Sequence, residues 1–127
     1  MKKNLPIVLC FLLSLLLVGC GKAVSGSDIF TFSEPTTQIT GSFYSQEQET
    51  PFQIATEDFS SIIKWFYDLK VTACDNPEEV EGAESYEFYV NGENAFTYED
   101  RGSESYIIID GNYYKISNPS IPPIAKP

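Results

Sequence analysis

The sequence contains no histidine and few basic residues. Its 127 residues include 8 Lys and Arg against 18 Asp and Glu, which gives a formal net charge of −10. Without His, the chain cannot form a Ser-His-Asp triad, a Cys-His nucleophile pair or a zinc site with His ligands. The scarcity of Lys and Arg argues against nucleic-acid binding, because that affinity comes largely from neutralising phosphates. We therefore expect no catalytic activity, no cofactor, no metal site and no nucleic-acid partner.

Long apolar runs are also scarce. The one continuous run is residues 6–18, which is too short to cross a bilayer comfortably, since a spanning helix takes roughly 20 residues. Lys2 and Lys3 precede it, as in the positively charged start of a secretory signal peptide. Elsewhere the hydrophobic fraction of 43% and the aromatic fraction of 14% favour a folded domain over disorder.

A small residue and a cysteine follow the apolar run. The string Leu17-Val18-Gly19-Cys20 resembles the lipobox of bacterial prolipoproteins. The resemblance implies that the Cys20 thiol receives a diacylglycerol and that signal peptidase II cleaves just before it. It thereby implies a lipid anchor in the cell membrane and an extracytoplasmic location. An ordinary secretory signal with an incidental Cys is the alternative, and neither says anything about the activity of the rest.

Cleavage before Cys20 would leave an even more acidic chain. All 18 acidic residues would stay with six Lys and Arg, for a net charge of −12. Anionic lipid headgroups repel such a domain, so we expect it to stand off the bilayer. Cys74 would then be the one unmodified thiol, unable to form an intrachain disulfide. We expect it to be a small buried side chain near a strand end.

The mature chain divides by composition into three parts. Residues 20–37 are the lipidated Cys and a tether that is rich in Gly and Ser at its start, within which the apolar residues 29–32 could dock as a short strand. Residues 38–117 form a small domain, and residues 118–127, with four Pro, form an extended tail.

The domain is predicted to be α+β. A helix is expected from Thr56 to about Asp68, because four apolar residues follow the i, i+3, i+4, i+7 spacing; these are Phe59, Ile62, Ile63 and Phe66. Residues 86–116 predict a four-stranded antiparallel meander, since Asn91-Gly92 and Asp110-Gly111 are strong hairpin dipeptides. The predicted fold is one amphipathic helix packed on this meander, with one to three additional N-terminal strands and a polar loop over residues 45–50.

Two groups of side chains are candidates for binding. The first is an acidic patch, either a solvated loop or a contact for a cationic partner, made of Glu78, Glu79, Glu81 and Glu84. The second is an aromatic sheet face. A single helix covers one face of a sheet, so several aromatics should lie on the other, either paired across strands or free to bind sugars or protein. Its candidates are Tyr89, Phe96, Tyr98, Tyr106 and Tyr113.

These features favour a non-catalytic binding module displayed on the membrane. One form of it captures a cationic secreted protein, since opposite charge accelerates association. The alternatives are binding of a glycan or cell-wall fragment through the tyrosines, and an accessory role in an envelope complex through the Pro-rich tail.

Overall fold

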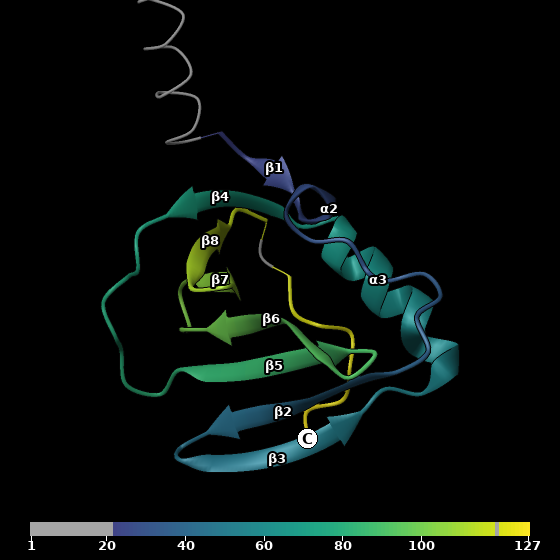
Figure 1. The fold of residues 1–127 in the computed structure, drawn as a ribbon. Helices are drawn as coiled ribbons and strands as arrows, with labels where there is room; N and C mark the ends of the chain where they lie inside the picture. Colours follow the sequence, from purple (N-terminus) through teal and green to yellow (C-terminus); the bar gives the residue numbers. More distant parts are fainter. Residues whose placement is uncertain (1–21, 119) are drawn as a thin grey trace, which may run out of the picture.

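The computed structural model describes residues 22–118 and 120–127, so the predicted signal peptide and lipobox lie outside the described residues. The described chain is mostly antiparallel β-sheet, with one helix of nine residues and two shorter helical turns (Figure 1). The strands are β1 (Val24–Ser25), β2 (Ile39–Ser45), β3 (Gln48–Gln53), β4 (Lys70–Cys74), β5 (Glu84–Val90), β6 (Glu93–Asp100), β7 (Ser105–Ile109) and β8 (Asn112–Ile116). The predicted α+β class fits only loosely, because eight strands exceed the predicted number.

The predicted meander forms the middle of the sheet. The strand order is β1-β4-β8-β7-β6-β5-β2-β3, so β5 to β8 lie side by side in chain order. The two dipeptides make the hairpin turns as predicted. The φ angle is 52° at Asn91 and 50° at Asp110, and Gly92 and Gly111 also have positive φ angles.

The loop predicted over residues 45–50 is wrong. The turn between β2 and β3 consists of Gln46 and Glu47, with φ of 50° and 67°, and Ser45 pairs directly with Gln48. The strands extend this far because β3 is an edge strand, where polar side chains remain in solvent.

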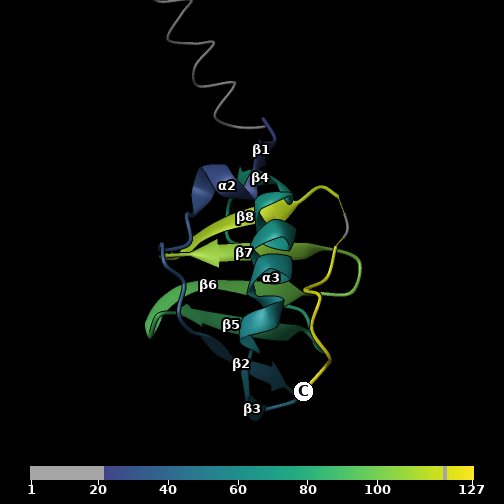
Figure 2. The same cartoon turned by 90° about the vertical axis from the view of Figure 1, so that its right-hand side faces the viewer.

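The helical elements lie on one side of the sheet. They are α2 (Gly26–Ile29), a 3₁₀ turn η1 (Thr56–Asp58) and α3 (Phe59–Tyr67). Figure 2 shows α3 running across the strands. Its buried residues are Phe59, Ile62, Trp65 and Phe66, while Ile63 is half-buried. The apolar stripe is thus confirmed, but Thr56 opens the 3₁₀ turn and makes no side-chain cap.

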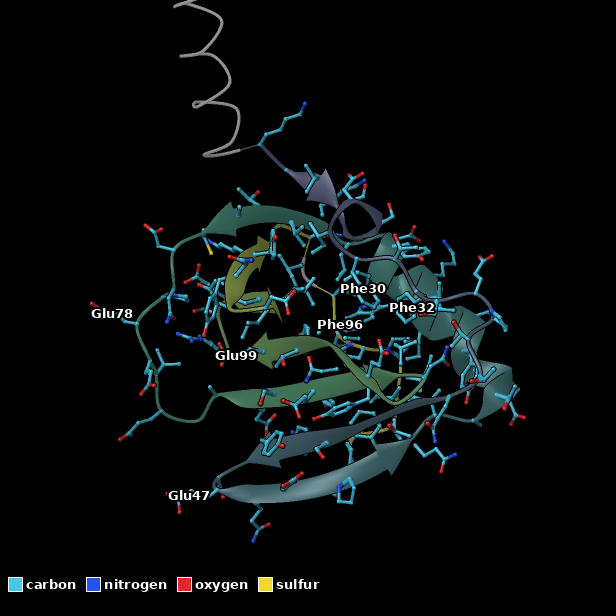
Figure 3. All side chains as sticks on the ribbon, viewed as in Figure 1. Phe30, Phe32, Glu47, Glu78, Phe96 and Glu99 are labelled. Atoms are coloured by element: carbon cyan, nitrogen blue, oxygen red, sulfur yellow. The ribbon has the colours of Figure 1, made fainter. Side chains whose placement is uncertain are left out.

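The segment predicted as a tether is largely packed onto the domain. β1 pairs with β4, and the Gly26 N–H donates to the Leu69 carbonyl at 2.9 Å. Phe32 is 3% exposed and packs on Phe66 and Phe96. A Gly/Ser-rich segment stays flexible only where docking buries no apolar surface. Here docking buries the rings of Phe30 and Phe32, which lowers the free energy of the packed state. Figure 3 shows both residues gathered with Phe96 between the covering layer and the sheet.

The Pro-rich tail crosses the same face of the sheet as α3. Figure 2 shows it along one side of the helix, while the segment after α2 follows the other side. Pro122 is buried, Ile124 packs against the core, and Lys126 pairs with Glu84 at 2.9 Å. The sheet therefore has one covered face, and we call the other its helix-free face.

Candidate functional site

Two of the predicted aromatic candidates are on the wrong face. Phe96 and Tyr98 are each 1% exposed and pack beneath α3, with Trp65 5.8 Å from the Tyr98 ring. The cause is a β-bulge: Tyr89 pairs with Asn94, whereas Phe88 pairs with Phe96 and skips a residue. A one-residue shift of register moves every following side chain of a strand to the opposite face. Phe96 and Tyr98 therefore belong to the core and cannot bind a partner.

The other three candidates are on the helix-free face. Tyr89 and Tyr113 are half-buried, whereas Tyr106 is 4% exposed. The Arg101 guanidinium covers Tyr106, with its carbon 5.3 Å from the ring centroid, and the Tyr113 ring packs edge-on against it. Tyr106 is therefore a support for neighbouring groups rather than a contact surface.

Arg101 also fastens the predicted acidic loop to the sheet. Its side chain is 7% exposed, its Nε donates to the Glu99 carboxylate at 2.6 Å, and its Nη1 donates to the Glu78 carbonyl. Among the described residues this is the one hydrogen bond that ties residues 75–83 to the rest of the protein. Burial is the largest single influence on the pKa of Arg101 and lowers it. The hydrogen bond to Glu99 and the charge of that carboxylate outweigh burial together with smaller effects, so the net pKa is raised.

The predicted acidic patch is divided by the fold. Glu78, Glu79 and Glu81 are exposed in the loop, and Figure 3 shows Glu78 pointing away from the domain. Glu84 instead begins β5 and bonds both Lys126 and Ser45, and the Lys126 bond lowers its pKa. Glu84 is therefore already neutralised by the tail and is not available to a partner.

A second acidic site lies on the helix-free side of β3, β2 and β5, and we call it the Tyr/Glu face. It consists of Ser42, Tyr44, Glu49, Glu87 and Tyr89. Only Tyr89 of these five was among the sequence candidates, and the other four were missed. The alternation of polar and apolar residues along β2 is the signal that could have found them once its pairing with β5 is known.

Hydroxyl groups hold both carboxylates of this face in place. Ser42 Oγ donates to Glu49 Oε2 at 2.7 Å, and the Tyr44 hydroxyl donates to the same oxygen at 3.2 Å. The Tyr89 hydroxyl donates to Glu87 Oε1 at 2.7 Å. Glu87 lies opposite Ser42 across the β2–β5 ladder, so the two carboxylates flank Ser42 from either side.

The two tyrosines report the negative field of the face. Burial raises the pKa of Tyr44 most, and Glu87 and Glu49 raise it further. The hydrogen bond to Glu87 is the main cause that raises the pKa of Tyr89. Both phenols therefore stay protonated at neutral pH and remain donors to their carboxylates.

Cys74 is not buried as predicted. It is a free, exposed cysteine at the end of β4. Partial desolvation raises the pKa of its thiol, and Asp75 adds to that shift. A thiol held protonated in this way is a poor nucleophile, so the exposure does not make Cys74 a reactive residue.

A shallow groove separates α3 from the tail on the covered face. It encloses about 440 Å³ between Trp65 and Leu69 on the helix side and Ile121 and Pro123 on the tail side. Trp65 Nε1 is buried and has no hydrogen-bond partner among the described residues. Ser61 and Lys64 stand exposed at its rim, where Lys64 pairs with Asp68 at 2.5 Å.

Other kinds of site find no support in the described part of the chain. No three of its Cys, Asp and Glu side chains lie close enough together to hold a metal ion. No helix within residues 22–127 as described is long and apolar enough to cross a membrane. No family model, curated protein or solved structure matches this chain.

Proposed function

We propose that the protein is a lipid-anchored, extracytoplasmic binding module without catalytic activity, and that it captures a cationic secreted protein. The anchor is the diacylglycerol on Cys20 that the lipobox-like string implies. The binding role rests on one observation, which is that half of the sheet carries carboxylates but no Lys or Arg of its own.

That half is β6-β5-β2-β3, and it has no positive charge of its own. Residues 23–63 and 71–100 contain no Lys or Arg. Three cations from elsewhere are already paired: Arg101 with Glu99 of β6, Lys126 with Glu84 of β5, and Lys115 with Glu104. The other carboxylates of this half, Glu49 and Glu87 among them, form no ion pair within the described residues, which favours a partner that supplies a counterion.

Lysozyme, a cationic secreted protein, is a suitable probe for this function. The full-length protein in vesicles of zwitterionic lipid should bind lysozyme, and binding should weaken as salt rises from about 0.01 M to about 0.1 M, where the Debye length falls from about 30 to about 10 Å. Lysozyme with acetylated lysines has lost much of its positive charge and is the matched control. Equal binding of both forms, or of neither, would contradict the proposal.

The anchor has its own test. Cys20→Ala should leave an uncleaved precursor, because the acylated thiol is lost. Normal processing and membrane retention of this variant would refute the lipoprotein assignment.

Glycan binding is the second candidate, and the half-buried rings of Tyr89 and Tyr113 favour it. It would be insensitive to salt and would be lost in Tyr113→Ala. The accessory role through the tail is less favoured, because Pro122 and Ile124 are packed on the protein's own core.

A further inference from the structure

We infer that the β1–β4 edge of the sheet faces the bilayer, with Lys22 and Lys70 against the phosphates of the lipid headgroups. This inference rests on the proposed lipid anchor at Cys20 and adds the orientation in which that anchor holds the domain. The partner of this edge is the membrane surface itself.

The first argument is the short link between the anchor and the sheet. β1 begins at Val24, so residues 21–23 are all that separate it from Cys20. A fully extended chain spans at most about 3.6 Å per residue, so Val24 lies within about 14 Å of the lipidated cysteine. The stand-off from the bilayer that the net charge alone predicts would need a longer spacer.

The second argument is that the segment after the link is bound to the domain and cannot act as a spacer. β1 pairs with β4, and the Gly26 N–H donates to the Leu69 carbonyl at 2.9 Å. A Cβ at Gly26 would clash with the carbonyl oxygen of Phe66, so the two backbones are in close contact. Phe32 is buried in the core a few residues further on. Lengthening the link by releasing this segment would therefore cost buried apolar surface.

The third argument is the charge of this edge. Four of the six Lys and Arg in residues 22–127 pair with carboxylates, whereas Lys22 and Lys70 form no ion pair within the described residues. Both are exposed, Lys22 just before β1 and Lys70 at the start of β4. Asp28 is the one carboxylate among residues 22–29 and 70–74. The edge therefore carries a net positive charge in an otherwise acidic protein.

The opposite edge has the reverse charge. β1 and β3 are the two edge strands, and Figure 1 shows them at opposite ends of the molecule. In a sheet of eight strands, inter-strand spacings of about 4.8 Å place them about 34 Å apart along the sheet. β6, β5, β2 and β3 carry no Lys or Arg, and their carboxylates are Glu49, Glu84, Glu87, Glu93, Glu99 and Asp100. Anionic headgroups attract the β1–β4 edge and repel this far half, so both effects favour the same orientation.

The test compares two labelled positions of the lipidated protein in vesicles that contain phosphatidylglycerol. One fluorophore is attached at alkaline pH to the native thiol of Cys74, which is exposed at the end of β4. The other is attached to Gln48→Cys in a Cys74→Ser background, at an exposed position of β3. A nitroxide on the lipid headgroup should quench the Cys74 label at least about threefold more strongly, because the width of the sheet separates the two positions. Either sheet face lying on the bilayer would quench both labels equally.

A charge test examines the contact with the phosphates. Lys22→Gln with Lys70→Gln should reduce the quenching difference between the labels by about half or more, because the attraction to the headgroups is lost. Lys115→Gln with Lys126→Gln makes the same change of charge at lysines that already have carboxylate partners, and should leave the difference unchanged. Equal effects of the two pairs would overturn the contact of Lys22 and Lys70 with the phosphates.

Vesicle flotation separates the orientation from the anchor. If the unmodified protein does not float with the vesicles, the proposed lipid anchor and this inference fail together. If it floats but the two labels are quenched equally, the anchor holds and the inferred orientation is wrong. Unaltered Trp65 fluorescence would verify that each variant is folded.

Discussion

Replacing Phe32 with alanine tests whether the segment before β2 belongs to the folded domain. The Phe32 ring is 3% exposed and lies 5.2 Å from Phe30, 5.6 Å from Tyr67, 5.8 Å from Phe66 and 6.0 Å from Phe96, all edge-on. Removing a buried phenylalanine ring typically costs about 3–5 kcal/mol, because apolar burial is lost and a cavity remains. Total stabilities of about 5–15 kcal/mol make this a large fraction.

The assay is urea unfolding of the full-length protein followed by fluorescence. Trp65 is the one tryptophan and is 9% exposed in the core, so its emission reports the packing between α3 and the sheet. With an m-value of about 1.5 kcal/mol/M, Phe32→Ala should lower the urea midpoint by about 2–3 M. Thr31→Ala, at the exposed neighbouring position, is the control and should lie within about 0.5 kcal/mol of the unmodified protein.

An unchanged stability of Phe32→Ala would mean that residues 22–37 are a tether, as the sequence predicts. If Phe32→Ala also lies within about 0.5 kcal/mol, the segment is not docked in solution and the domain begins at β2. Tyr67→Phe gives an intermediate check, since the Tyr67 hydroxyl accepts from the Phe32 N–H at 2.9 Å. Its loss should cost about 1 kcal/mol if the segment is in place.

Two further predictions concern the ion pairs of the domain. Arg101→Gln removes the bond to the Glu78 carbonyl, so a glutamate-specific protease should cleave residues 75–83 faster than in the unmodified protein; an unchanged rate would mean that the loop is held by other contacts. In Lys126→Met, the free energy of unfolding should fall less steeply as the pH is lowered. Lys126 lowers the pKa of Glu84 from 4.5, so this contribution is present above about pH 4.5 and is lost as the pH falls through the lower folded-state pKa. Unfolding free energies between about pH 6 and 3 measure it, and identical slopes in both proteins would contradict it.

Local signals in the sequence predicted the elements that local physics determines. The Asn91-Gly92 and Asp110-Gly111 turns formed because these dipeptides accept positive φ, and α3 formed where the apolar period is helical. The packing of residues 22–37 and of the tail depends on contacts with α3 that are distant in sequence. No local pattern carries that information, since Gly/Ser and Pro content describes the free chain alone.

The aromatic face failed for a different reason, which is the bulge after Phe88. Counting back from the Asn91-Gly92 turn in regular register would pair Phe96 with Glu87 and place it on the helix-free side with Tyr89. The structure pairs Phe96 with Phe88 instead, and Ala95 and Phe96 are both buried. Burial of Phe96 against Phe66, with ring centroids 4.3 Å apart, favours this register. The sequence shows the alternation, but only the packing decides which face each residue takes.

This reassignment separates two tyrosines that the sequence alone makes equivalent. Tyr98 is 1% exposed beneath Trp65, so Tyr98→Ala should cost about 3–5 kcal/mol of stability, as for other large buried aromatics. Tyr89 is half-buried with its hydroxyl on Glu87, so Tyr89→Ala should cost less than about 1 kcal/mol yet weaken lysozyme binding by severalfold. Both variants are measured for unfolding and, without denaturant while both are folded, for lysozyme binding. Tyr98→Ala should lose more stability, and Tyr89→Ala should lose more affinity. If Tyr98→Ala weakens binding more than Tyr89→Ala while folded, Tyr98 lies on the helix-free face in solution, as a regular register without the bulge would place it.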